Sequence, residues 1–324
     1  MKRKITSILI MTFLLFFTFS LFLFPEDIVK SVILSIIIWK ENVFPALFPF
    51  FMVSTLLINY GFIDLLGELT KNIMNKLFYL PGESSFVLIG SMLSGFPSSS
   101  KYVKDLYLKK LISKNEASYL LCFTHFSNPL FIISTIGISF LHDKKIGFII
   151  LLCHSLTNFI IAFVFRPKEN KYKYINKHKT SIKTALSKMH YKRLTSKKFG
   201  IVLGESINNT INTLLLLLGI ITSFLIISTI INNIFNFKSL YKGIISGILE
   251  MTQGIKYLSI LNISNTIKAS LITFIISFGG LSVHSQTISI ISDTDIKYKY
   301  FFIARIYHAI ISSSLVFLIL KFMK

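Results

Sequence analysis

Acidic residues are scarce in this chain, which has 14 Asp and Glu against 35 Lys and Arg among its 324 residues. Charged residues make up only 15% of the chain, whereas 52% are hydrophobic and the mean hydropathy is +0.66. The length would suffice for two soluble domains, but so apolar a composition excludes them. The composition instead predicts an all-α polytopic membrane protein.

Cysteine is also scarce, and the two residues present, Cys122 and Cys153, both lie in apolar segments. Because cysteine in such segments behaves as a small hydrophobe, we expect neither a disulfide framework nor a metal site. The chain has no G-x-S-x-G, no phosphate-binding P-loop, no H-E-x-x-H and no His or Cys cluster with metal-ligand spacing. We therefore expect no enzymatic activity, no cofactor and no bound metal.

Long apolar runs are what the chain does contain. A helix needs about 20 apolar residues to cross the hydrocarbon of a bilayer. The runs that meet this need are Ile5–Phe24, Val43–Tyr60, Ala117–Phe140, Ile146–Phe165, Thr210–Ile231, Ala269–Ile291 and Phe301–Leu320. The fold predicted is therefore about seven full transmembrane helices plus two re-entrant or broken segments. The first run is longer than a usual signal-peptide core and has no small-x-small cleavage site, so residues 1–24 are predicted to be a retained anchor.

The basic residues are concentrated in one linker, Arg166–Lys198, which holds 12 of them against one acid, Glu169. Lys and Arg accumulate in cytoplasmic loops, so we interpret the linker as a topology determinant. A nucleic-acid arm is the less favoured interpretation, since no aromatic interleaving accompanies the charge. If residues 2–4 (Lys-Arg-Lys) are also cytoplasmic, the chain crosses the membrane an even number of times between them and the linker. The four apolar runs before the linker already satisfy this, so Ser84–Leu93 is predicted to be re-entrant.

The two halves of the chain share an outline. Each has a long apolar helix, a short Gly-interrupted stretch, a helix broken by polar residues and a final helix. An odd number of crossings separates the two short stretches, which predicts an inverted repeat like that of many secondary transporters. The predicted domains are the anchor 1–24, a first repeat 25–165, a basic cytoplasmic linker 166–200 and a second repeat 201–324.

Two breaks in the first half are candidates for binding a polar solute. In SGFPSSSKYVK, Pro97 removes a backbone donor and Gly95 permits a turn, while the three following serines can bond the freed groups. Irregular backbone survives in a membrane only inside protein or along a wet cavity. Two ordinary turns at the membrane surface are the alternative. The candidate residues are Gly95, Phe96, Pro97, Ser98, Ser99, Ser100, Lys101, Phe126, Ser127 and Asn128.

The second half supplies further candidates. Glu250 lies in the apolar stretch ISGILEMTQG, where a charge costs about 2.5–3.5 kcal/mol near the bilayer centre. It would couple a proton, pair with a cation, orient a hairpin, or be solvated at an interface. On the last helix, Arg305 and His308 are neighbours on one face, an arrangement suited to binding a carboxylate. In the alternative interpretation, Arg305 extends to water at the membrane interface. The candidates are Glu250, Gln253, Gly279, Gly280, His284, Gln286, Arg305 and His308.

One polar stripe is predicted to face the bundle. Its members, at i, i+3, i+4 and i+7, are Glu205, Asn208, Asn209 and Asn212. A stripe facing lipid would be penalised, so it either lines a pathway or joins helices.

Five stretches follow one another in an order that resembles a known family. They are FPALFPFF, LPGESSFVLIGSMLSGFPSSSKYVKDLYLKKLISKNEASYLLCFTHFSNPLFI, GILEMTQGIK, SFGGLSVHSQ and ARIYHA. The chain resembles the YlbJ (SpoVV) family of sporulation integral membrane proteins, in the nucleoside-recognition, or Gate, group of membrane domains. The family pattern G-[FY]-P-x-G-x-K has Ser99 in place of its second glycine, and S-G-P-L-F has Asn128 in place of its glycine.

The resemblance implies transport of dipicolinic acid from the mother cell across the outer forespore membrane. Dipicolinate carries two carboxylates on an aromatic ring, so we expect Lys101, Arg305 and helix N-termini to attract it, with Phe96 and Phe126 stacking on the ring. The expected partners are the lipid bilayer, this anionic aromatic solute and other sporulation membrane proteins, without nucleic acid. A non-transporting assembly component of the forespore envelope and a nucleoside transporter are the alternatives.

Overall fold

A computed structural model describes residues 2–171 and 181–323, and these residues are helical with short connections. The first half contains α1 (Lys2–Leu23), α2 (Pro25–Ile38), the π-helical segment η1 (Trp39–Val43), α3 (Phe44–Asn59), α4 (Phe62–Leu77), α5 (Ser84–Ser94), α6 (Ser98–Leu108), α7 (Lys114–Phe123), the π-helical η2 (Phe131–Phe140) and α8 (Lys144–Val164). The second contains α9 (Ile182–Thr195), α10 (Phe199–Phe235), α11 (Ser239–Leu249), α12 (Met251–Ser259), α13 (Asn265–Phe278), α14 (Gly280–Ile291) and α15 (Tyr298–Phe322).

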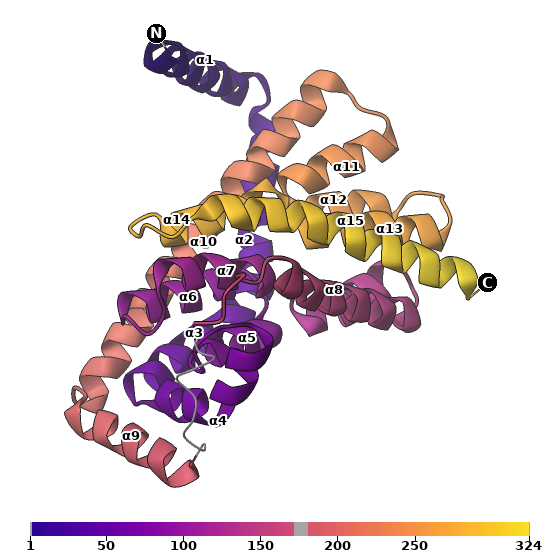
Figure 1. The fold of residues 1–324 in the computed structure, drawn as a ribbon. Helices are drawn as coiled ribbons and strands as arrows, with labels where there is room; N and C mark the ends of the chain where they lie inside the picture. The colour runs from indigo at the N-terminus through magenta and orange to yellow at the C-terminus, as the bar shows by residue number, and fades with distance from the viewer. Residues whose placement is uncertain (1, 172–180, 324) are drawn as a thin grey trace.

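The prediction of an all-α polytopic membrane protein is confirmed. Five helical stretches are long and apolar enough to cross a membrane: Pro25–Asn59, Lys144–Val164, Phe199–Phe235, Asn265–Ile291 and Tyr298–Phe322. Large apolar side chains cover their outer surfaces, as lipid contact requires. The predicted anchor is helix α1, which extends from the bundle and contacts chiefly α2 (Figure 1); Met1 lies outside the described residues.

The predicted span limits need two corrections. Ala117–Phe140 is not one continuous helix, because α7 ends at Phe123 and η2 begins at Phe131. Val43–Tyr60 is only the second part of a longer stretch, because η1 joins α2 to α3 without a break. The apolar run of α2 lies between Lys30 and Lys40, and these charges, with Glu26 and Asp27 before them, hid it from a search for long uncharged runs.

Helix α10 is a 37-residue rod that runs along α2 and α3 (Figure 1). Hydroxyl pairs join it to α2: Ser31 contacts Thr229 at 2.8 Å, and Ser35 contacts Thr222 at 2.7 Å. Farther along, Trp39 donates its indole N–H to Leu214 O at 2.8 Å. Such hydrogen bonds between helices substitute for the hydrophobic effect, which does not drive helix association within lipid.

Each half of the chain contains a helical hairpin whose tip meets a break in another helix. In the first half α5 and α6 form the hairpin, and an added Cβ at Gly95 would lie 2.7 Å from the backbone N of Asn128, between α7 and η2. In the second half α11 and α12 form it, and an added Cβ at Gly280, between α13 and α14, would lie 3.2 Å from Met251 N. These matching pairs accord with the predicted repeat; their opposed orientation in the membrane stays a prediction.

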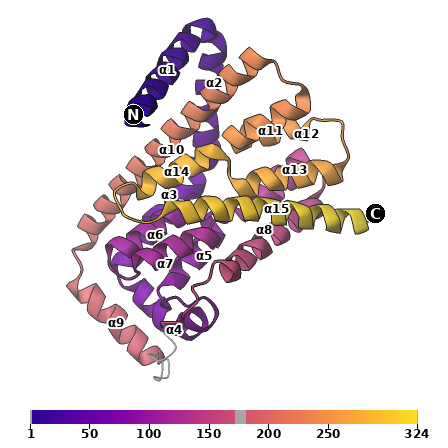
Figure 2. The same ribbon diagram turned by 45° about the horizontal axis from the view of Figure 1, so that its top comes forward.

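The basic linker contains a folded helix that docks on α4. Lys188 pairs with Glu68 at 3.1 Å, and Lys192 pairs with Asp64 at 3.1 Å. Both views place α9 beside α4, at the end of the molecule away from α11 and α12 (Figure 2). Residues 172–180 of the linker lie outside the described residues.

The polar stripe on α10 does not face the bundle, so that prediction is wrong. Its four members are all exposed, whereas Val202, Ser206 and Thr210 form the buried face beside them. The physical reason is the length of the helix. A helix of 37 residues exceeds the roughly 20 needed to cross hydrocarbon, so its first turns need not lie in lipid. Glu205 accordingly pairs with Lys197 of the linker at 2.6 Å.

Candidate functional site

The breaks surround a cavity of about 610 Å³, within the range of about 300–1,000 Å³ typical of small-molecule sites. Its walls come from α2, η1, α3, the α5–α6 break, the α7–η2 break, the hairpin tip between α11 and α12, and α14. Of the residues predicted from sequence, those that line it are Phe96, Pro97, Ser127, Asn128, Glu250, Gln253 and Gln286. Side chains from both halves of the chain thus meet in one space.

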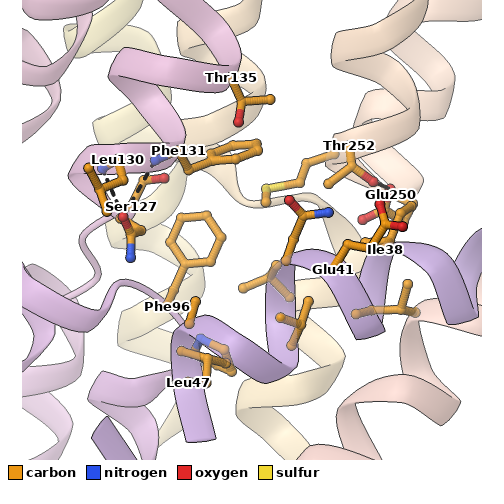
Figure 3. Close-up of a pocket in the computed structure, with 18 of the residues that line it drawn as sticks. Ile38, Glu41, Leu47, Phe96, Ser127, Leu130, Phe131, Thr135, Glu250 and Thr252 are labelled. Carbon is orange, nitrogen blue, oxygen red and sulfur yellow. Dashed lines mark hydrogen bonds between the residues drawn. The ribbon is translucent and has the colours of Figure 1, made fainter. Parts of the chain in front are cut away.

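The α5–α6 break is held open by its own polar groups. Gly95 has a φ of +81°, a conformation that L side chains rarely adopt, and its N–H still bonds to Ser91 O at 2.9 Å. Ser94 Oγ and Ser98 Oγ lie 2.6 Å apart, and the Ser98 hydroxyl donates to Gly95 O. Phe96, half-buried, is left pointing into the cavity (Figure 3).

The α7–η2 break is capped by Asn128. Its Oδ1 accepts the backbone N–H of Leu130 at 2.8 Å and that of Phe131 at 3.4 Å, and its Nδ2 donates to Ser94 O at 3.5 Å. The amide thus begins the helix that follows and ties this break to the α5–α6 hairpin. Ser127 donates its backbone N–H to His154 Nε2 at 3.0 Å.

Glu250 separates α11 from α12 and caps the second of these helices. Its Oε2 accepts the Gln253 N–H at 3.0 Å and the hydroxyl of Thr252. A carboxylate that accepts such bonds at a helix N-terminus is stabilised by the exposed N–H groups. Of the roles predicted for Glu250 from sequence, this geometry matches the one in which the carboxylate orients a hairpin. Gln253 is 8% exposed, and its Oε1 has no hydrogen-bond partner among the residues that the structure describes.

The cavity is chemically two-sided. Phe96 and Phe131 lie on one side, and Glu250 with Thr252 lies on the other (Figure 3). Sequence reasoning missed Glu41, Phe131, Thr252 and Lys256, which also line it. Glu41 could have been found from sequence, because it is an acid between two apolar runs. In the structure it falls in the π-helical η1, and π-helical segments are frequent at functional sites.

Several predicted residues lie outside the lining. Lys101 Nζ pairs with Asp105 at 2.8 Å, contacts Thr55 Oγ1 at 3.3 Å and lies 5.6 Å from the centroid of the Phe51 ring. Ser100 bonds to Thr287 of α14 at 3.1 Å. The others outside it are Gly95, Ser98, Ser99, Phe126, Gly279, Gly280, His284, Arg305 and His308.

His284 is fully engaged with its neighbours. Its Nδ1 lies 2.7 Å from the Tyr298 hydroxyl, and its Nε2 lies 3.1 Å from Phe278 O. Since both ring nitrogens are occupied, this histidine joins α14 to the end of α13 and the start of α15. The contacts match a structural role better than a solute-binding one.

Arg305 lies in the protein interior with 0% exposure. Its guanidinium donates to Cys122 O, to His125 O at 3.4 Å and to Asn158 Oδ1 at 3.3 Å. It also lies 2.9 Å from His308 Nδ1, which must accept, because Arg only donates. The ion pairs found between described residues do not include Arg305. A buried cation thus faces only neutral acceptors.

The chain is 33% identical over 341 aligned positions to "Sporulation integral membrane protein YlbJ" of Bacillus subtilis (strain 168), an alignment that covers 98% of this chain and 84% of that protein. The Gate family, described as nucleoside recognition, matches residues 41–144. No solved structure matches the chain.

Proposed function

The chain belongs to the YlbJ family of sporulation integral membrane proteins, and we propose that it transports dipicolinic acid across the outer forespore membrane, from the mother cell to the forespore. The N-terminus and the basic linker then face the cytoplasm of the mother cell. No enzymatic step is part of this proposal, and the bilayer and the solute are the partners it requires.

The observation that carries the proposal is the cavity between the interrupted helices. In membrane proteins, irregular backbone is tolerated where it is buried or lines a cavity, and discontinuous helices form the solute sites of many transporters. Here two hairpin tips and two helix breaks from both halves of the chain converge within one bundle. Paired breaks of this kind support transport over a purely structural role.

The lining suits a flat solute with polar edges. Phe96 and Phe131 offer aromatic faces on one side of the cavity. Amides from three different elements, Asn128, Gln253 and Gln286, offer donors for carboxylate oxygens. Lys256 is the lysine of this lining. In this proposal Lys101 supports the fold through Asp105 and does not contact the solute.

The transport step follows from the two-part construction. We take the two halves to be inverted repeats, so that one rocks against the other and exposes the cavity first to one side and then to the other. The contacts that would change are the close approaches between the hairpin tips and the opposing breaks. The coupling ion is to be found by experiment.

Uptake of labelled dipicolinate into proteoliposomes, with and without a pH gradient, tests the proposal. We expect uptake by the wild-type chain and a loss of about tenfold in Gln286→Leu, since a hydrogen bond to a charged group is removed. Asn209→Leu makes the same change on the exposed face of α10 and is the matched control. An absence of flux in vesicles that contain folded wild-type protein would refute transport.

Nucleoside transport is a second candidate, favoured by the match of residues 41–144 to the nucleoside-recognition family. Nucleobases also stack on aromatic rings and bond to amides, so the lining alone does not distinguish the two solutes. Competition does: excess uridine should leave dipicolinate uptake unchanged if the first proposal holds. The assembly alternative predicts instead that removal of α9 abolishes function while Gln286→Leu does not.

A further inference from the structure

His125 is an isolated polar side chain in the centre of the protein. It is wholly buried, and neither Nδ1 nor Nε2 has a hydrogen-bond partner among residues 2–171 and 181–323. Buried polar groups in proteins are almost always paired, and an exception calls for an explanation such as a ligand or an ion. Only its place in the polar stretch THFSNP distinguishes His125 in the sequence.

Three elements enclose this imidazole. On one face lies the ring of Phe96, stacked with centroids 4.6 Å apart and an interplanar angle of 7°. Phe301 of α15 meets it edge-on at 5.0 Å. Its Nε2 faces the break between α13 and α14, because an added Cβ at Gly279 would lie 3.3 Å from it. The imidazole therefore lies where the α5–α6, α7–η2 and α13–α14 breaks come together.

A fully buried cation contacts the backbone of His125. Arg305 donates to the carbonyl O of His125 at 3.4 Å, and its Nε has no partner within the described part of the chain. A buried cation without a carboxylate is costly, and here only neutral groups offset that cost: oxygen and nitrogen acceptors and the Phe301 ring, whose centroid lies 5.6 Å from the guanidinium carbon. Together the two side chains leave three ring or guanidinium nitrogens for a ligand.

Phe96 links the His125 ring to the cavity. Phe96 lines the cavity and is stacked on His125. It is half-buried and belongs to the non-helical link between α5 and α6, so a rotation of this ring does not require a helix to unwind. The aromatic face that Phe96 now covers would then be open to a solute in the cavity.

We propose that His125 and Arg305 form a closed binding site for an aromatic carboxylate, which the Phe96 ring covers and which the solute reaches when Phe96 turns aside. The solute enters the space that Phe96 leaves, and its carboxylate bonds to the imidazole N–H and to Arg305. A nucleoside lacks the carboxylate, so Arg305 would favour the acid over it. The identity of the solute as dipicolinate rests on the proposed function.

Equilibrium binding of dipicolinate to the purified full-length chain gives the first test. His125→Phe keeps a ring for Phe96 to stack on and removes both nitrogens, so we expect affinity to fall by about tenfold. His190→Phe, on the exposed face of α9, should stay within about twofold of wild type. Wild-type affinity in His125→Phe would overturn the closed site and leave the transport proposal standing.

Reagent access gives a second test that does not depend on dipicolinate. In a Cys122→Ala, Cys153→Ala background, His125→Cys is treated with a carboxylate-bearing methanethiosulfonate. We expect slow modification when Phe96 is present and a rate at least about tenfold higher with Phe96→Ala. Phe44→Ala removes another half-buried stacked ring, which does not line the cavity, and should not raise the rate.

The outcomes separate the two proposals. Equal modification rates with and without Phe96 would overturn the closed site whatever the binding data are. If wild type binds no dipicolinate, the transport proposal fails, and the rate increase with Phe96→Ala alone decides whether the closed site exists.

Discussion

The α11–α12 hairpin depends on three glycines that let its two helices touch. An added Cβ at Gly254 would lie 2.1 Å from Gly247 Cα and 2.8 Å from Gly243 O. Carbon atoms in contact prefer a separation of about 3.5–4.0 Å, so Gly254→Ala requires the two helices to move apart by more than about 1 Å. The opposing atoms are backbone, and no rotamer change relieves the overlap.

The magnitude follows from this geometry. Overpacking of a close contact costs about 1–3 kcal/mol, and we expect the upper end because the whole hairpin must shift. Gly204→Ala on α10 is the matched control, since no atom lies within 4 Å of its added Cβ. Alanine favours a helix over glycine by about 0.5–1 kcal/mol, so the control should be neutral or stabilising.

Thermal unfolding of the two variants in detergent measures the difference. We expect a lower Tm for Gly254→Ala than for wild type, and an unchanged or higher Tm for Gly204→Ala. Because Glu250 and Gln253 lie on this hairpin and line the cavity, uptake should fall together with Tm. Equal Tm values for the two variants would refute the close packing on which the reasoning rests.

Three further predictions concern caps and ion pairs. Glu250→Ala should destabilise by about 1 kcal/mol through loss of the α12 cap, whereas Glu250→Gln, which still accepts the N–H, should retain most of that stability in thermal unfolding. Lys188→Glu should make α9 more sensitive to limited proteolysis, and a second change, Glu68→Lys, should restore protection. In the loop after α14, the Lys104 ammonium bonded to Asp293 holds the pKa of that carboxyl below its usual range. This ion pair therefore stabilises the folded state above the ordinary Asp pKa of about 3.9, and the stabilisation is lost as pH falls through the lower pKa of the folded state. Asp293→Asn should remove this small acid dependence of Tm. An unchanged dependence would contradict the assignment.

The breaks in the helices could be predicted from sequence because they rest on local chemistry. Gly95 and Pro97 together favour a helix break, since one permits a turn and the other lacks a backbone donor, and Gly279 takes a left-handed conformation that other residues avoid. Glu250 stood out because a carboxylate is costly in an apolar run. Each of these signals needs only the few residues around it.

The direction in which a side chain points could not be predicted, because it depends on segments far along the chain. Lys101 and Arg305 were expected to meet the solute as cations. Lys101 turns to Asp105, and Arg305 lies outside the cavity lining, bonded to carbonyl groups of α7 and the break after it. His125 gave no signal of its own. It is enclosed by Phe96, from the same half of the chain, and by Phe301, from the last helix.

If the proposed function holds, the placement of charge explains how one cavity serves an anion within a membrane. The acids of the lining, Glu41 and Glu250, lie in η1 and at the α11–α12 tip, and the second is already engaged as a helix cap. The fully buried cation, Arg305, bonds to the carbonyl O of His125, whose ring is stacked on Phe96, and the ion pairs found among the described residues do not include it. A site that exposed Arg305 permanently would bind its anion tightly and release it slowly, because attraction is strong at low dielectric. A cover that opens and closes lets the same cation draw the solute in and then give it up, which transport requires.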